Sequence, residues 1–190
     1  RRQSTIDEPI LPLRLWRNRW MVPLNLAALA SNMIIIGVSS FLPAFVQGVM
    51  GYSPIIAGFT LTTMSIGWPI ASTLAGKLMV KVGFRPLALS GGVALILGAV
   101  LFVFLSVGFG PIWAGAASFI IGVGMGLTST TFIVAIQSKV AWNMRGIATA
   151  NNMFMRMLGN ALGAALLGGV LNNQLQRYFQ SLNEPINSEL

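Results

Sequence analysis

The stretch GKLMVKVGFRP, residues 76–86, joins two long apolar segments and holds three cations within eleven residues. The segments on its two sides, 54–80 and 86–107, contain no other charged residue. A hydrocarbon core about 30 Å thick needs roughly 20 helical residues to cross it, so each segment is long enough to span a bilayer. The pattern predicts two transmembrane helices joined by a short basic turn.

The chain contains no carboxylate side chain between Glu8 and Glu184, although it has 12 lysines and arginines in total. A carboxylate at the centre of a membrane helix costs about 2.5 to 3.5 kcal/mol on insertion scales. Hydrophobic residues make up 55% of the chain, charged residues only 8%, and the mean hydropathy is +0.75. Globular domains carry about 25% charged residues, so we predict an all-α polytopic membrane protein.

Five segments are long and apolar enough to span, and a proline stands at or near the start of three of them, where its missing N–H costs little. The expected helices cover residues 20–47, 54–80, 86–107, 111–140 and 146–171, and the three prolines are Pro54, Pro86 and Pro111. Residues 1–19 are expected to be a cytoplasmic linker, and the polar residues 172–190 an extracytoplasmic loop. Because the chain begins with Arg and the number of spans is odd, we expect a piece of a longer polypeptide that also contains an N-terminal half and a further helix.

The cations are distributed asymmetrically along these helices. All except Arg156 and Arg177 lie before the first expected helix, around the turn between the second and third, or between the fourth and fifth. The other two connections, 48–53 and 108–110, carry no charge. The positive-inside rule then predicts a multi-pass protein of the cell membrane, with its N-terminus cytoplasmic and the end of the chain outside.

The composition also limits the chemistry. The chain has no Cys and no His, so thiolate or imidazole metal sites and Ser/His or Cys/His nucleophiles are excluded, and no metal or cofactor is expected. Without carboxylates inside the spans, an enzyme is disfavoured. The net charge of +8 does not indicate nucleic-acid binding, because the cations lie in short clusters separated by long apolar stretches.

Polar residues distinguish the expected helices from one another. The third, 86–107, has only Ser90 and Ser106 as polar side chains, so we expect it at the periphery against lipid. The first carries polar residues seven apart, which keeps them roughly on one face: Asn25, Asn32 and Ser39. They either line an aqueous cavity or hydrogen-bond neighbouring helices.

Small residues at four-residue intervals predict close packing of two helices. One such stripe is Ser118, Gly122, Gly126 and Thr130, and another is Ala161, Ala165 and Gly169. Pro43 and Pro69 lie inside apolar runs, where a proline removes a backbone hydrogen bond and bends or breaks the helix.

Arg156 is the most informative single residue. It lies eleven residues beyond Arg145, about 16 Å deeper along a helix, and Asn152 and Asn160 flank it one turn away on each side. An arginine near the membrane centre indicates function, through an anionic partner or access to water. The alternatives are pairing with backbone carbonyls or with another part of the protein, or extension of the side chain to the inner headgroups.

The basic turn resembles the loop motif Gly-x-Leu-Ala-Asp-Arg-x-Gly-Arg-Lys of the major facilitator superfamily. The fitting residues are Gly76, Leu78, Lys81, Gly83 and Arg85, and Val80 replaces the acidic residue. The resemblance implies a gating role for this loop, while the missing acid argues against a charge relay.

Further segments resemble the second half of the fourteen-helix drug/proton antiporters within that superfamily. They are residues 41–47, 51–54, 57–58, 122–127, Gln137, 145–150 and 156–163. In that family the five helices would be the ninth to the thirteenth. The resemblance implies efflux of amphipathic, often cationic compounds in exchange for protons, by alternating access between two halves.

The side chains that such a site would use are both polar and apolar. Met64 and Trp68, with Phe45, Phe132 and Phe154, would give an adaptable apolar lining, or they are lipid and core contacts. Arg156 keeps a second function open, a carrier of sugars or metabolite anions. A third interpretation is a scaffold without transport activity, or an inactive truncated fragment.

Overall fold

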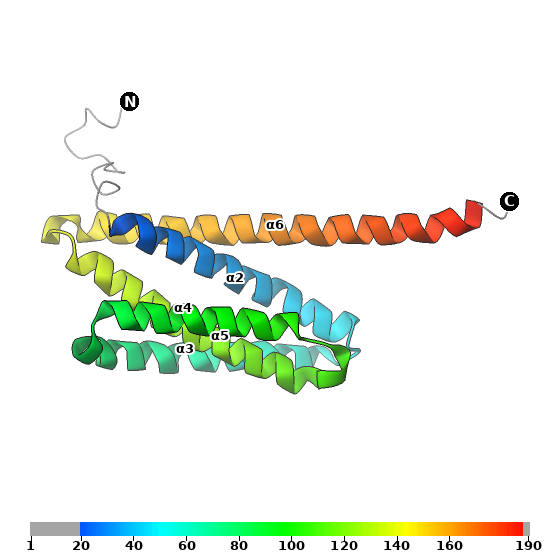
Figure 1. The fold of residues 1–190 in the computed structure, drawn as a ribbon, viewed down its shortest axis with the longest axis horizontal. Helices are drawn as coiled ribbons and strands as arrows, with labels where there is room; N and C mark the ends of the chain where they lie inside the picture. Colours follow the sequence, from blue (N-terminus) through cyan, green and yellow to red (C-terminus); the bar gives the residue numbers. More distant parts are fainter. Residues whose placement is uncertain (1–19, 188–190) are drawn as a thin grey trace, which may run out of the picture.

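The computed structural model describes residues 20–187, and for residues 107 and 181–187 it describes the backbone only. This range contains no strand. Five of its helices are long and apolar enough to cross a membrane. They are α2 (Met21–Gly48), α3 (Pro54–Val82), α4 (Phe84–Val103), α5 (Gly110–Ser138) and α6 (Arg145–Asn187), joined in part by the short 3-10 turns η2 (Val107–Phe109) and η3 (Trp142–Met144) (Figure 1). The all-α membrane fold is confirmed.

Local chemistry sets the ends of α3. The side chain of Ser53 accepts a hydrogen bond from the backbone N–H of Ile56 across 3.5 Å, and Pro54 follows at the first helical position. At the other end Gly83 has a φ of +81°, a conformation that is strained for any residue with a Cβ. The glycine of the basic turn therefore allows the sharp reversal from α3 into α4.

The prolines expected to bend or break two helices do not end either of them, because α2 continues through Pro43 and α3 through Pro69. The third helix is shorter than expected, since α4 stops at Val103 rather than at residue 107 and leaves Ser106 outside it.

The expectation of a polar loop over residues 172–190 is wrong for most of that segment, because α6 continues to Asn187. No Gly or Pro interrupts residues 170–184, and the segment contains Leu, Gln and Arg, which favour a helix. At 43 residues α6 is about 64 Å long, roughly twice the thickness of the hydrocarbon core. Its C-terminal part projects beyond the ends of the other helices (Figure 1).

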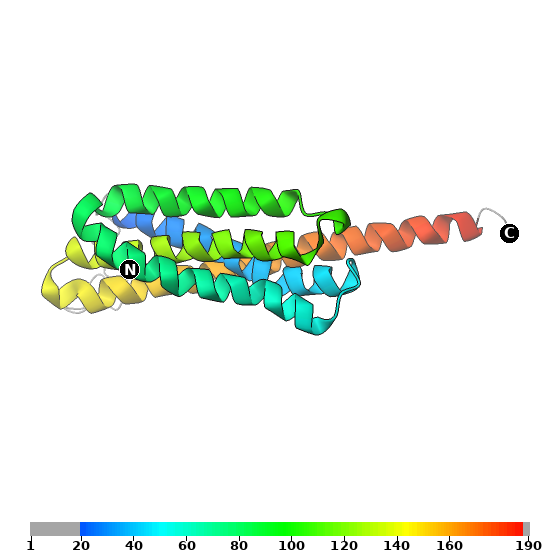
Figure 2. The same cartoon turned by 90° about the horizontal axis from the view of Figure 1, so that it is seen from below.

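The helices form two packing groups, α5 with α3 and α4, and α2 with α6. Figure 2 shows α4 and α3 running beside α5, with the far end of α6 extending out of the bundle. Fewer contacts link the groups, mainly from α2 to α3 and α5. The core therefore centres on α5, which has the largest buried share of the five helices.

The small-residue stripe of α5 packs against α3, as expected. A Cβ placed on Gly126 would lie 2.7 Å from the Cβ of Ala71, and a Cβ on Gly122 would overlap the backbone of Met64. The hydroxyls of Ser72 and Thr130 share a hydrogen bond across 2.6 Å at the same interface. Glycine here lets two backbones meet without intervening side chains.

The other stripe does not pack in this structure, since Ala161, Ala165 and Gly169 are exposed. Gly159 and Gly163 instead lie against Leu29 and the backbone of Met33 on α2. A shift of two residues turns a helix by about 200°, so the two sets of small residues face opposite sides. The expected packing seam on α6 was assigned to the wrong face.

Helix α4 is peripheral. Its buried residues, Leu87, Gly91, Leu95 and Gly98, face α5, and a Cβ on Gly91 would lie 2.7 Å from Thr128. Most of its other large side chains are exposed, including Val93, Ile96 and Leu97. This distribution fits a helix with one face on the bundle and the rest against lipid.

Candidate functional site

Two asparagines join α2 to α6 inside the bundle. The amide nitrogen of Asn152 donates a hydrogen bond to the side-chain oxygen of Asn25 across 3.1 Å, and both residues are buried. Within the described range, the amide nitrogen of Asn25 has no hydrogen-bond partner. The pair therefore fixes the two helices together and leaves a donor available next to it.

Beside this pair lies a small cavity of about 10 Å³, close to the space that one water molecule needs. We call it the Arg156 cavity. It is lined by Ala28, Ser31, Asn32, Met125, Thr128, Ser129, Phe132, Asn152 and Arg156. Helices α2, α5 and α6 meet at this point. Four residues singled out from the sequence, Asn32, Asn152, Phe132 and Arg156, thus lie together.

Arg156 is the only charged residue in the lining of this cavity. Its side chain is partly buried, and no carboxylate occurs anywhere between residues 9 and 183. The amide of Asn32 donates to the carbonyl of Ala28 across 2.8 Å, and the hydroxyl of Thr128 to that of Gly124 across 2.8 Å. Because no carboxylate is among the described residues that line the cavity, Arg156 has no anionic partner in its wall, and two of its polar neighbours bond to their own helices.

Other residues expected at the site lie elsewhere. The side-chain oxygen of Asn160 is buried, lines none of the cavity, and is without a hydrogen-bond partner among the described residues. Met64 and Trp68 pack against the core cluster of Leu95, Ile121 and Met125. Phe154 is exposed, and Ser39 donates to the carbonyl of Ile35 on its own helix. Met64 and Trp68 are therefore core contacts in this structure.

The sequence reasoning missed three polar residues of the Arg156 cavity, Ser31, Thr128 and Ser129. Two of them belong to the run TSTT, residues 128–131. Four successive hydroxyl residues in an apolar span were a signal that this part of α5 faces something polar.

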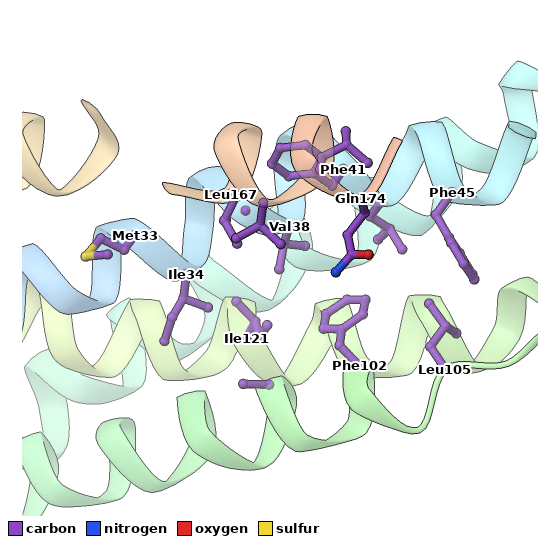
Figure 3. Close-up of a pocket in the computed structure, with 15 residues that line it drawn as sticks. Met33, Ile34, Val38, Phe41, Phe45, Phe102, Leu105, Ile121, Leu167 and Gln174 are labelled. Carbon is purple, nitrogen blue, oxygen red and sulfur yellow. The ribbon is translucent and has the colours of Figure 1, made fainter. Parts of the chain in front are cut away.

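A larger cavity of about 510 Å³ lies between α2, α4 and α6, and we call it the apolar groove (Figure 3). Figure 3 shows Phe41 and Phe45 of α2, Phe102 of α4 and Leu167 of α6 around it. Gln174 is its only polar side chain among those lining it. The groove has no charge or hydrogen-bonding cluster to orient a ligand, so the candidate site is the Arg156 cavity despite its smaller size.

The loop motif occupies the end of the bundle where α3 ends and α4 begins. Gly76 faces open space, Lys81 is exposed in the last turn of α3, and Gly83 makes the reversal. The guanidinium of Arg85 lies over the ring of Trp20, 4.7 Å from its centroid. The structure thus gives Gly83 and Arg85 local roles, and a gating role for the motif stays a prediction.

Comparison with known proteins agrees with this architecture. The sequence profile of the Major Facilitator Superfamily matches residues 1–164. The chain is 32% identical over 170 residues to multidrug transporter protein MdtP of Bacillus subtilis (strain 168), which covers 90% of this chain and 31% of that protein. It is 31% identical over 167 residues to multidrug resistance protein 3 of the same organism, covering 88% and 33% of the two chains.

A third relative is a tetracycline resistance determinant of Streptomyces rimosus, 28% identical over 167 residues, with 87% of this chain and 48% of that protein covered. The bundle of membrane-length helices with amides and a single arginine in its interior defines a multi-pass membrane protein. The chain belongs to the Major Facilitator Superfamily. It spans about a third of the length of the two Bacillus relatives.

Proposed function

We propose that this chain is part of a carrier that exports amphipathic compounds, and that the Arg156 cavity is its contribution to the substrate path. The names of the relatives, which include a multidrug transporter and two resistance proteins, support export as the activity. The chain covers about a third of the two Bacillus relatives, which supports an N-terminal half, supplied by the same polypeptide, that closes the path from the other side.

The observation that carries the proposal is the position of Arg156. A cation at this depth is expensive unless water, an anion or polar groups stabilise it. Here three helices bring hydroxyls and amides to it, and some of the polar atoms nearby, such as the amide nitrogen of Asn25, have no partner in the described part of the chain. Such a cluster is suited to binding a ligand, or to binding water molecules that are exchanged during transport.

In a proton-coupled exporter that works by alternating access, the two halves would have different roles. A proton site of the usual kind needs a carboxylate or histidine, and residues 9–183 contain neither. The proton-binding group of a proton-coupled exporter would therefore lie outside residues 9–183, which include the membrane-spanning parts of these helices. The electrostatic environment of Arg156 would then change when that group gains or loses its proton across the shared cavity.

The cation pattern supports a defined orientation in the cell membrane. Arg85 and Lys139 lie beside Trp20, and Arg145 begins α6 at the same end, where Met21 packs with Ala148. This end would face the cytoplasm. The residues after the membrane-spanning part of α6 would then lie outside, as a helical extension rather than the expected loop.

One observation favours a second candidate function. Residues 9–183 contain no carboxylate that could neutralise Arg156, which is the arrangement expected if the substrate itself brings a negative charge. A carrier of small metabolite anions would use Arg156 to hold the anionic group.

Transport by the complete open reading frame distinguishes these functions. Everted membrane vesicles containing the wild-type protein are expected to accumulate a cationic dye when a proton gradient is applied, and to lose this uptake with Arg156→Ala. Uptake of an anionic metabolite without dye transport would favour the second function. Transport of neither class by a correctly inserted protein would support the interpretation of a scaffold without transport activity and contradict the proposal.

A further inference from the structure

Three side chains from three helices meet at the end of the bundle that we assign to the cytoplasm. The guanidinium of Arg85 lies 4.7 Å from the centroid of the Trp20 ring, and the ammonium of Lys139 lies 6.0 Å from it. Trp20 immediately precedes α2, Arg85 is in the first turn of α4, and Lys139 follows α5. Two cations thus share one aromatic ring.

Residues 9–183 contain no acidic side chain that could balance these two cations. Arg85 and Lys139 both contact the Trp20 ring. A cation–π contact contributes about 0.5 to 1 kcal/mol at an exposed site, which offsets little of the repulsion between like charges held close together. The arrangement favours an anion that residues 9–183 do not supply.

The same residues line a cavity of about 400 Å³, which we call the basic cavity. Its lining is Trp20, Leu24, Phe84, Arg85, Ala88, Thr131, Ala135 and Lys139. On each of the three helices, the next lining residue one turn deeper into the bundle is apolar: Leu24, Ala88 and Ala135. The cavity therefore has a charged end at the membrane surface and an apolar wall that continues toward the membrane interior.

The apolar wall holds one hydroxyl, that of Thr131, which is fully buried two turns deeper than Lys139 and lies too far in to reach an anion at the charged end. At the charged end, one further feature suits an anion. The N-terminus of α4 is not capped by a side chain, so its first backbone N–H groups, at Phe84 and Arg85, are free of an intrahelical partner. The positive end of the α4 dipole adds to the charge of Arg85. The negative end of the α5 dipole partly compensates the charge of Lys139.

We propose that the basic cavity binds an anionic phospholipid of the inner leaflet. The phosphate would lie between Arg85 and Lys139, and an acyl chain would follow Leu24, Ala88 and Ala135. A free phosphate would use the charged end alone and leave the apolar wall empty, so the shape favours a lipid. Basic pockets between helices on the cytoplasmic side are suited to such headgroups. This inference rests on the orientation given under the proposed function and is independent of what is transported.

The test is lipid binding to the complete open reading frame, purified in detergent and titrated with phosphatidylglycerol or phosphatidylcholine while bound lipid is counted by native mass spectrometry. We expect phosphatidylglycerol to bind more tightly. The double variant Arg85→Gln/Lys139→Gln is expected to weaken its binding by roughly 10- to 30-fold, given about 1 kcal/mol per cation near anionic lipid. The matched control Lys77→Gln/Lys81→Gln removes the same charge from residues that do not line this cavity.

A second variant tests the apolar wall without touching a charge. Ala88 is partly buried beside the cavity, so Ala88→Phe would fill the space where the acyl chain lies. We expect this variant to lose phosphatidylglycerol while keeping its melting temperature. Equal loss in the Lys77/Lys81 control, unchanged binding in both test variants, or full competition by millimolar glycerol phosphate would each overturn the proposal, the last by showing a free-phosphate site.

Discussion

Asn152 of α6 donates its amide hydrogen bond to Asn25 of α2 across 3.1 Å, and neither side chain is accessible to solvent. The bond therefore joins the first and the last described helices at the level of the candidate site. It lies one turn from Arg156 along α6, so the position of that arginine depends on how firmly these two helices are held together.

We expect loss of this bond to destabilise the bundle modestly. Asn152→Ala would leave the oxygen of Asn25 buried without a partner, at a cost of about 1 to 3 kcal/mol. Hydrogen bonds between membrane helices contribute about 0.6 kcal/mol on average, and this is the coupling expected from a double-mutant cycle with Asn25→Ala. Reversible unfolding in mixed micelles measures both values. Strictly additive effects of the two substitutions would show that the bond contributes nothing.

The close approach of α3 and α5 at Gly126 predicts that a large side chain at this position destabilises the fold. A side chain there meets Ala71 and the backbone of α3, so Gly126→Leu must push the helices apart and destabilise the fold by about 1 to 3 kcal/mol or more. Gly168→Leu is the control, because nothing lies within 4 Å of a Cβ on Gly168. The melting temperature in detergent measures both. If the two variants melt at the same temperature, the seam is not as tight as described.

Arg156→Ala is expected to abolish transport by the complete protein while leaving its insertion and expression unchanged, because the cavity would lose its only charge. Arg156→Lys tests geometry, since an ammonium cannot make the forked contacts of a guanidinium, and we expect it to restore only part of the activity. Arg177→Ala is the control, because Arg177 is exposed on the projecting part of α6. Dye efflux that persists in Arg156→Ala would remove this residue from the mechanism.

The orientation can be tested with single cysteines, because the chain contains none of its own. Ser53→Cys lies in the uncharged turn before α3 and is expected to react with an impermeant maleimide added to intact cells. Lys81→Cys lies at the opposite end of α3 and is expected to react only after the membrane is permeabilised. The reverse pattern would invert the proposed topology.

The helical extension of α6 makes a distance prediction. In a continuous helix the twelve residues from Gly168 to Gln180 span about 18 Å. Spin labels at Gly168→Cys and Gln180→Cys are expected to give a narrow distance distribution near this value, and a pair at Gly146→Cys and Leu158→Cys provides the reference within the bundle. A broad distribution from the first pair alone would support the loop that the sequence indicated.

Much of the fold followed from a few residues whose chemistry allows few alternatives. Pro54 marks the start of α3, Gly83 marks its end, and the acid-free spans indicate a lipid environment. The end of α6 was misjudged because Asn and Gln are polar and were interpreted as a loop. Polarity decides whether a segment enters the membrane, whereas the helix propensity of its residues favours or disfavours continuation of the helix.

The candidate site was predictable only in part, for a geometric reason. Spacing along one helix identified the polar line of Asn152 and Arg156, but a single sequence does not tell which faces of different helices meet. Small residues occur on both sides of α6, so the choice between Gly159 with Gly163 and Ala161 with Ala165 could not be made from spacing. For the same reason, spacing did not show that Met64 and Trp68 lie on the packed side of α3.

The length of α6 has a mechanical consequence. It is held against α2 as far as Leu167, whose side chain lies beside Gly37, and beyond that point most of its described side chains are exposed. A rigid rod fixed over one half and free over the other acts as a lever, so a small change of tilt at Gly159 becomes a larger displacement at Gln180. A rearrangement around Arg156 within the membrane would therefore produce a measurable movement of the end of α6 outside the membrane.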